Sequence, residues 1–160
     1  MVLGDARLSL TRVTDCCYDL IVLDAFSSDA IPIHLLTKEA LQLYLSRLAA
    51  GGILAFHISN RYLDLKPVLG DLAQDSNLTC LVREDTKLGD AEMKAQKAAS
   101  IWVVLSRRPS DLDGLISDLR WKPLYGRKGA KLWTDDFSNI PSVFMWSSIR
   151  MQVEQIKRAF

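Results

Sequence analysis

Cysteine is scarce in this chain, and the few copies do not form the patterns that bind metals or build disulfide frameworks. The 160 residues contain only Cys16, Cys17 and Cys80. The number is odd, and adjacent cysteines rarely bridge each other. No Cys-x-x-Cys pair is accompanied by a second pair or by histidines at zinc-site spacing. We therefore expect reduced thiols, no metal site and a cytoplasmic location.

The chain also lacks a charge excess, a long apolar run and a leader sequence. Its formal net charge is +1, which favours neither a nucleic-acid partner nor a membrane surface. No apolar segment reaches the roughly 18 to 20 residues of a membrane span, and the start lacks the regions of a signal peptide. Apolar residues make up 49% and charged residues 24% of the chain, which indicates one globular domain, residues 1–160.

A glycine-rich loop of the Gly-x-Gly-x-x-Gly type is missing as well, although the remaining pattern is that of an α/β protein. Continuous apolar runs alternate with segments whose apolar residues recur at helical spacing, which predicts a parallel sheet with helical crossovers. Thr37 is expected to cap the first long helix and Gly51-Gly52 to end it. The expected strands are 20–23, 53–58, 78–83 and 100–106, and the expected helices are 37–50, 65–73, a short one capped by Ser110, and an amphipathic tail, 149–160.

Two carboxylates follow the first of these strands. The stretch from Tyr18 to Leu36 begins with a continuous apolar run, typical of a strand buried on both faces, and the run stops at Asp24. Asp29 comes next, in a loop closed by Pro32. Open α/β sheets bind ligands outside the carboxyl ends of their strands. Both acids are therefore candidates for handling a cationic or hydroxylated substrate, although Asp24 also suits a simple turn or helix cap.

Four stretches together resemble one known family: Gly4-Asp5-Ala6-Arg7, Asp19–Thr37, His57–Asp64 and Trp133–Asn139. The family is that of spermidine synthases (polyamine aminopropyltransferases), and the chain is similar to its C-terminal half, most closely in the bacterial branch fused to a transporter-like membrane domain. The resemblance covers most of the chain. It implies a Rossmann-like, methyltransferase-type sheet that lacks its first strands. It also implies aminopropyl transfer from decarboxylated S-adenosylmethionine to putrescine, which yields spermidine and methylthioadenosine.

The resemblance implies roles for the two acids after the first strand. Asp24 and Asp29 would hold the attacking amine and accept its proton, with Asp29 favoured as the base and Asp24 as the ligand of amine and donor. The loop between Asp24 and Pro32 is one residue longer than the family's usual Asp-x-x-Asp-Pro arrangement. Which acid is the base therefore stays open.

Two further places are implied as parts of the site. Gly4, Asp5 and Ala6 would contact the adenosyl part of the donor, while Asp135 and Asp136 would face the mouth of the site as weaker candidates for substrate binding. From the residues alone, Gly4-Asp5 reads as a strand end turning over a glycine, and two neighbouring acids favour an exposed turn.

These residue types suit the implied chemistry. Both substrates are cations, so an acidic pocket lowers the cost of bringing them together. A carboxylate within hydrogen-bond reach can take the proton that the amine must lose before it attacks. The electrophile is already a sulfonium, so the reaction needs no metal, and the only cofactor-like molecule expected is the co-substrate decarboxylated S-adenosylmethionine.

Parts of the family pattern are missing from this sequence. They are the first strands, the glycine-rich donor loop, the acidic ribose ligand that follows the second strand, and an N-terminal β-hairpin domain. A Tyr-Pro-x-Gly-x-Trp segment is missing too, and in its place stands the polar, loop-like stretch 84–98. The sequence therefore predicts a fragment, a truncated gene product or a partner that needs a separate N-terminal half, with a homodimer as a further alternative. It also predicts an exposed edge on strand 20–23. Two other functions stay open: a methyltransferase that uses intact S-adenosylmethionine, and a non-catalytic half-domain that binds a partner.

The two histidines give no pattern of their own. His57 lies on a strand expected to be buried, which favours a core histidine with satisfied hydrogen bonds. His34 is expected to shape the junction between the acidic loop and the following helix.

Overall fold

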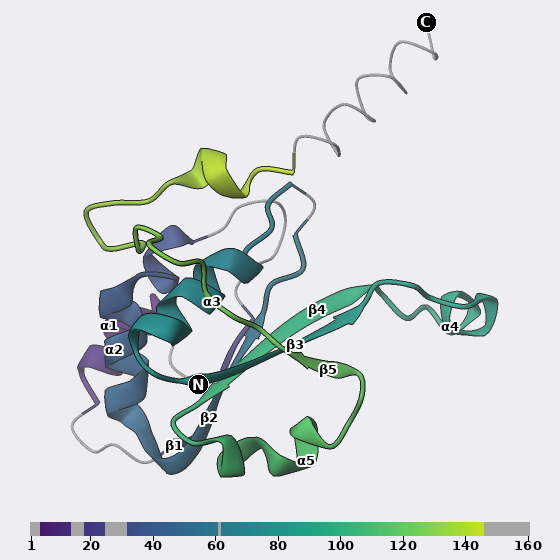
Figure 1. Cartoon of the computed structure of the whole chain (residues 1–160), viewed down its shortest axis with the longest axis horizontal. Coiled ribbons are helices and arrows are strands. Elements are labelled where there is room, and N and C mark those ends of the chain that lie inside the picture. Colours follow the sequence, from purple (N-terminus) through teal and green to yellow (C-terminus); the bar gives the residue numbers. More distant parts are fainter. Residues whose placement is uncertain (1–3, 14–17, 25–31, 61, 146–160) are drawn as a thin grey trace, which may run out of the picture.

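The computed structural model describes residues 4–13, 18–24, 32–60 and 62–145 (Figure 1). They form a five-stranded sheet in the order β1-β2-β4-β3-β5. The strands are Tyr18–Leu23 (β1), Leu48–His57 (β2), Thr79–Asp85 (β3), Ser100–Ser106 (β4) and Trp121–Pro123 (β5). The helices are Ala6–Thr11 (α1), Lys38–Arg47 (α2), Lys66–Asp75 (α3), Asp90–Lys94 (α4) and Asp113–Ile116 (α5), and short 3-10 turns occupy Ile33–Leu35, Pro109–Leu112 and Ile140–Val143.

The sheet is mixed rather than parallel. β1 and β2 are parallel, but β4 lies between β2 and β3 and is antiparallel to both. β5, which the sequence did not indicate, is antiparallel to β3. The prediction of a wholly parallel sheet is therefore wrong. The reason is the connection from β3 to β4, which returns as a hairpin with α4 at its tip instead of crossing over the sheet.

Helices α2 and α3 cover one face of the sheet and bury the main core. Tyr44 of α2, Leu69 of α3 and Phe56 of β2 are each 1% exposed. The predicted start of α2 is confirmed, because the Thr37 hydroxyl accepts the backbone N–H of Ala40 at 3.2 Å. α3 also begins where expected, with its proline in the first turn.

The end of α2 differs from the prediction. The helix stops at Arg47 and the chain passes directly into β2, so that Gly51 and Gly52 lie in the strand. A Cβ on Gly52 would lie 2.9 Å from the Tyr18 carbonyl oxygen. The register between β1 and β2 shifts at this place. Glycine here permits the close approach of two strands and does not end a helix.

The second face of the sheet is only partly covered. A smaller core lies near α5, formed by Ala55, Leu81, Val104 and Leu112. Over β1 this face is open, and three of its apolar side chains are exposed: Tyr18 by 41%, Leu20 by 55% and Val22 by 50%. The prediction of a strand buried on both faces is wrong for β1. The expected exposed edge is confirmed within the described residues, where β1 pairs only with β2.

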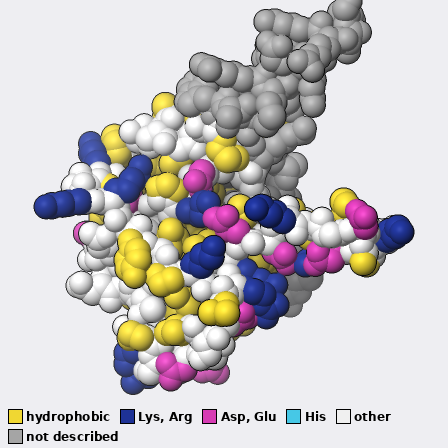
Figure 2. Space-filling model, turned by 45° about the vertical axis from the view of Figure 1, so that its right-hand side comes forward, with side chains coloured by type: hydrophobic (Ala, Val, Ile, Leu, Met, Phe, Trp, Pro, Cys, Tyr) yellow, Lys and Arg dark blue, Asp and Glu magenta, His cyan; other side chains and the backbone are white. Residues whose placement is uncertain are grey.

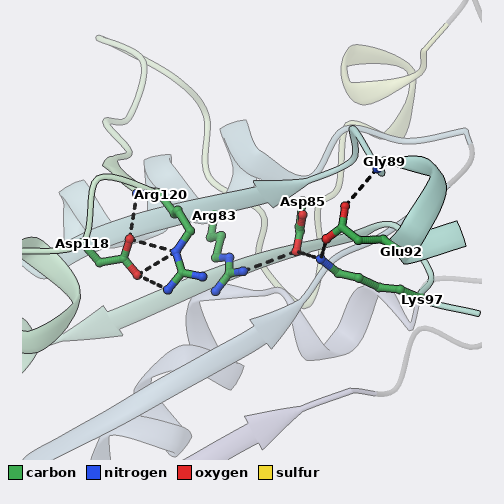
Figure 3. A network of polar contacts seen from close by, with 7 residues as sticks. All are labelled: Arg83, Asp85, Gly89, Glu92, Lys97, Asp118 and Arg120. Carbon is green, nitrogen blue, oxygen red and sulfur yellow. Dashed lines mark hydrogen bonds and ion pairs between the residues drawn. The ribbon is translucent and has the colours of Figure 1, made fainter. Parts of the chain in front are cut away.

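The segment between β3 and β4 projects from the body as an arm, and it contains the helix α4 where the sequence predicted only a loop (Figure 1). Lys97 Nζ lies 2.7 Å from Asp85 and 2.5 Å from Glu92 (Figure 3). Its hydrogen bonds lower the pKa of both carboxyl groups. Beside the arm, Asp118 pairs with Arg120. The hydrogen bonds from the Arg120 guanidinium lower the pKa of Asp118 to about 2. Basic and acidic side chains thus alternate over this side of the molecule (Figure 2).

The segment after β5 is fastened to α3. Asp71, whose side chain is 4% exposed, accepts the backbone N–H of Arg127 at 2.6 Å and binds its guanidinium at 2.6 Å. Beside this pair the two backbones meet at Gly70 and Gly126. A Cβ on Gly70 would lie 2.7 Å from the carbonyl oxygen of Tyr125. This attachment fixes the path of the chain toward the predicted site residues Asp135 and Asp136.

Two remaining helix predictions have different outcomes. Ser110 does not cap a helix but lies inside the turn Pro109–Leu112, and the helix that follows is the single turn α5. The amphipathic tail 149–160 lies outside the described residues. Among the described residues, no helix has the length and apolarity that crossing a membrane requires.

Candidate functional site

Asp24 lies directly after β1, at the carboxyl end of the sheet, next to the end of β2. The register pairs Leu23 with Phe56, so the next residues, Asp24 and His57, are neighbours. His57 Nδ1 is 2.6 Å from Asp24 Oδ1, and Ser59 Oγ is 2.7 Å from His57 Nε2. The two strand ends thus bring a carboxylate, an imidazole and a hydroxyl into one chain of hydrogen bonds.

The imidazole of this array is held from its face as well as from its two nitrogens. Trp102 of β4 is opposite His57 in the register and stacks on its ring, with centroids 4.8 Å apart and planes 18° apart. The His57 side chain is 26% exposed and that of Asp24 is 61% exposed. The prediction of a core histidine is therefore wrong: the ring is satisfied, but it lies at the rim of the sheet and not inside the core.

A cavity of about 300 Å³ opens beside the serine end of the array. Its lining residues are Ser59, Asn60, Thr86, Ala99, Ser100 and Ile101. Ile101 donates its backbone N–H to Ser59 Oγ at 2.8 Å. Ser59 thus both lines the cavity and contacts the imidazole.

A second group of predicted site residues consists of Gly4, Asp5 and Ala6 near the start of the chain and Asp135 and Asp136 near its end. Gly4 has φ +134°, which suits glycine, and Ala6 is the first residue of α1. The prediction that a strand ends at Asp5 is wrong. Asp5 caps α1, since its Oδ1 accepts the Leu8 N–H at 2.9 Å. This hydrogen bond is the main cause that lowers the pKa of Asp5. Its other oxygen lies 3.2 Å from His34 Nε2, and His34 thus ties α1 to the start of α2.

Asp135 joins this second group through Arg7. The guanidinium binds both carboxylate oxygens at 2.6 and 2.7 Å, and the Thr37 hydroxyl donates to Oδ1 at 2.7 Å. Arg7 also donates to the carbonyl of His34 at 2.9 Å. The Arg7 hydrogen bonds hold the pKa of Asp135 below its ordinary value. The Asp135 carboxylate is therefore committed to contacts within the protein.

Asp136 is placed differently from its neighbour. It lies in a turn closed by Thr134 and Phe137 and lines a cavity of about 300 Å³ with His34 and Asp135. The structure thus brings the residues predicted to bind the donor, near the start of the chain, close to the two acids predicted to face the mouth of the site, near its end. No hydrogen bond or ion pair joins them to Asp24 in the described parts of the chain. Asp29 lies outside the described residues.

Sequence reasoning missed His57 and Ser59, although a signal was present. Two consecutive strands of the expected parallel sheet, 20–23 and 53–58, end near Asp24 and near His57-x-Ser59. Side chains at the carboxyl ends of adjacent parallel strands meet at one edge. Taken alone, as a single residue on a strand expected to be buried, His57 gives no such signal.

No protein-family model and no curated protein matches this chain. Among solved structures it is similar to a probable spermidine synthase from Corynebacterium glutamicum ATCC 13032, with 15% identity and a TM-score of 0.54 over 86% of this chain. The match covers 55% of that protein, so the chain spans about half its length. MnmC2 from Aquifex aeolicus is a weaker likeness, with 19% identity and a TM-score of 0.44 over 81% of this chain and 39% of that one. The fold is Rossmann-like and of the methyltransferase type. The predicted fold class is confirmed.

The described residues hold no cluster of three or more His, Cys, Asp or Glu side chains that could bind a metal ion. Cys80 is buried, and burial raises the pKa of its thiol to about 12. A nucleophilic role for this cysteine is therefore disfavoured at neutral pH.

Proposed function

We propose that this chain forms the amine-binding side of an aminopropyltransferase, which moves an aminopropyl group from decarboxylated S-adenosylmethionine to putrescine. Asp24 carries the proposal, because it is a largely exposed carboxylate held by His57 at the carboxyl end of the sheet. The sequence resemblance to spermidine synthases supports the choice of reaction, and the similar C. glutamicum structure is itself a probable spermidine synthase.

In this reaction Asp24 binds one ammonium group of the acceptor. The amine loses a proton, and its nitrogen attacks the carbon next to the sulfonium of the donor. The C–N bond forms as the C–S bond breaks, and methylthioadenosine leaves as a neutral thioether. Asp29 is the proton acceptor that the sequence favours. Holding nitrogen, carbon and sulfur in line supplies much of the rate enhancement.

The second group of residues is the proposed donor side. Asp5 and the cavity beside His34 would contact the adenosyl part of the donor, with Gly4 and Ala6 framing it. Since Asp135 is bound by Arg7, Asp136 is the better candidate for contact with a cationic substrate. The glycine-rich donor loop of the family pattern is not in this sequence.

Replacing Asp24 with asparagine is expected to lower kcat/KM at least 100-fold, because the amide can neither pair with the ammonium nor anchor His57 as a carboxylate does. The measurement is release of methylthioadenosine from decarboxylated S-adenosylmethionine and putrescine. Asp118→Asn is the matched control, since it alters an acid on the far side of β3 that pairs with Arg120. Wild-type protein that releases no methylthioadenosine, alone or with a supplied N-terminal half, would refute the function. Faster turnover with intact S-adenosylmethionine would identify a methyltransferase.

A second candidate function is binding of another polypeptide through β1, and the open face of this strand favours it. Tyr18, Leu20 and Val22 are about half exposed on one face, and the edge of β1 is unpaired within the described residues. Exposed edges and apolar patches of this kind pair readily with another chain. A second copy of this chain suits the edge, because two antiparallel β1 strands form a symmetric contact.

For this candidate we expect a dimer in size-exclusion chromatography with light scattering. The double substitution Leu20→Lys and Val22→Lys should convert it to a monomer, because two charges would have to be buried at the contact. Leu119→Lys is the control, since Leu119 is 93% exposed and lies away from β1. A wild-type protein that stays monomeric up to high micromolar concentration would rule out pairing between copies.

A further inference from the structure

We propose that His57 is the proton acceptor of this site, that Ser59 passes to it the proton of an amine bound in the adjoining cavity, and that Asp24 stabilises the imidazolium formed. The inference rests on the proposed function, since it assigns the proton of that reaction to a named atom. It also changes one expectation, because the base is then His57 and not Asp29.

The hydrogen bonds of the array fix the direction in which a proton can move. A carboxylate can only accept, so the 2.6 Å contact with Asp24 places the proton of the neutral imidazole on Nδ1. Ser59 Oγ accepts the N–H of Ile101, which leaves the hydroxyl hydrogen for Nε2. The His57 Nδ1–H, the Ser59 hydroxyl and the Ile101 N–H thus each have one acceptor. The basic lone pair of the ring faces the serine, which is also a lining residue of the cavity.

Proton transfer along this line balances without any further reagent. The ammonium N–H bond breaks as an O–H bond forms on Ser59, while the original Ser59 proton moves to Nε2 of His57. The amine keeps its electron pair and becomes the nucleophile. The products inside the protein are a neutral hydroxyl and an imidazolium that is hydrogen-bonded to the Asp24 carboxylate.

Two neighbours of His57 make contacts that an imidazolium can use. Asp24 supplies a negative charge at 2.6 Å from Nδ1. Trp102 offers an aromatic face to the ring at 4.8 Å, and such a face attracts a cation. The stack and the two hydrogen bonds also fix the ring orientation, so no reorientation is required when the proton arrives.

The first test does not depend on turnover. Nitrogen-15 NMR of the full chain reports which ring nitrogen of His57 carries the proton. We expect protonated Nδ1 and unprotonated Nε2 in the neutral ring, with the Nδ1 signal shifted by Asp24→Asn and the Nε2 signal shifted by Ser59→Ala. Ser46→Ala is the matched serine control, since its hydroxyl donates to a carbonyl in α2. A ring that carries its proton on Nε2 would overturn the relay.

The second test uses the active protein, with methylthioadenosine release as the readout. His57→Asn keeps an N–H donor toward Asp24 but has no atom that can take up a proton, and we expect a 100- to 10,000-fold lower kcat. His57→Ala leaves space beside Trp102, and added imidazole should restore part of its activity. If the wild-type protein is active in this assay, full activity of His57→Asn would refute this inference and leave the proposed function standing.

A serine hydrogen-bonded to a histidine and an aspartate also has the geometry of a nucleophile. A fluorophosphonate probe distinguishes the two roles, because it modifies only an activated serine. We expect no labelling of Ser59. Covalent labelling that disappears in both Ser59→Ala and His57→Ala would make Ser59 the reactive group and would overturn the relay.

Discussion

Replacing Asp71 with alanine is expected to lower the free energy of unfolding by about 3 kcal/mol. The carboxylate is nearly inaccessible and holds both the backbone N–H and the guanidinium of Arg127. Its removal leaves a backbone donor without its acceptor. The guanidinium is 47% exposed and can turn to water, so the loss is smaller than for a fully buried pair. Urea unfolding followed by circular dichroism measures it.

The control for this prediction is Asp118→Ala. Asp118 binds Arg120 through two carboxylate oxygens, much as Asp71 binds Arg127, but it lies on the surface. Surface pairs of this kind contribute little, so the midpoint of unfolding should barely move. Equal losses for the two variants would show that the burial of Asp71 has no special weight.

Valine at position 70 is expected to destabilise the protein by about 3 kcal/mol for a steric reason. A Cβ on Gly70 would lie 2.7 Å from the carbonyl oxygen and 3.1 Å from the carbonyl carbon of Tyr125. Both atoms belong to the backbone and cannot turn aside as a flexible side chain would. α3 and the segment after β5 must therefore separate, which also weakens the contact between Asp71 and Arg127.

Gly114→Val is the matched control, because a Cβ at Gly114 in α5 meets no atom within 4 Å. We expect its unfolding midpoint to stay close to that of the wild type. Because Gly70 and Asp71 hold the same segment, the double variant should lose less than the sum of the single losses. Full additivity, or an unchanged midpoint for Gly70→Val, would contradict the close approach of the two backbones.

Local signals in the sequence were sufficient for the helices that cover the core. Thr37 caps α2 with its own side chain, and Pro67 is in the first turn of α3, so both starts could be located from a few neighbouring residues. Gly51-Gly52 misled the same reasoning. Its role depends on Tyr18, a residue more than thirty positions away that no local pattern indicates.

The candidate site was predictable to the extent that it depends on strand ends. Asp24 could be proposed because it follows an apolar run. Its contact with His57 depends on the register between β1 and β2, and the stacking of Trp102 depends on the direction of β4. The exposure of β1 was also beyond reach, because an apolar run looks the same whether or not another chain segment covers it.

The central position of β4 has a consequence for how this protein is made. β2 and β3 are not paired with each other, and β4 joins them. A ribosome-bound chain that ends before Ser100 therefore contains β2 and β3 but lacks β4, the strand that joins them. The hairpin of β3 and β4 closes over a short distance, whereas its docking on β2 spans about fifty residues, so the local step should come first. β3 therefore cannot join the pair of β1 and β2 before β4 has been made.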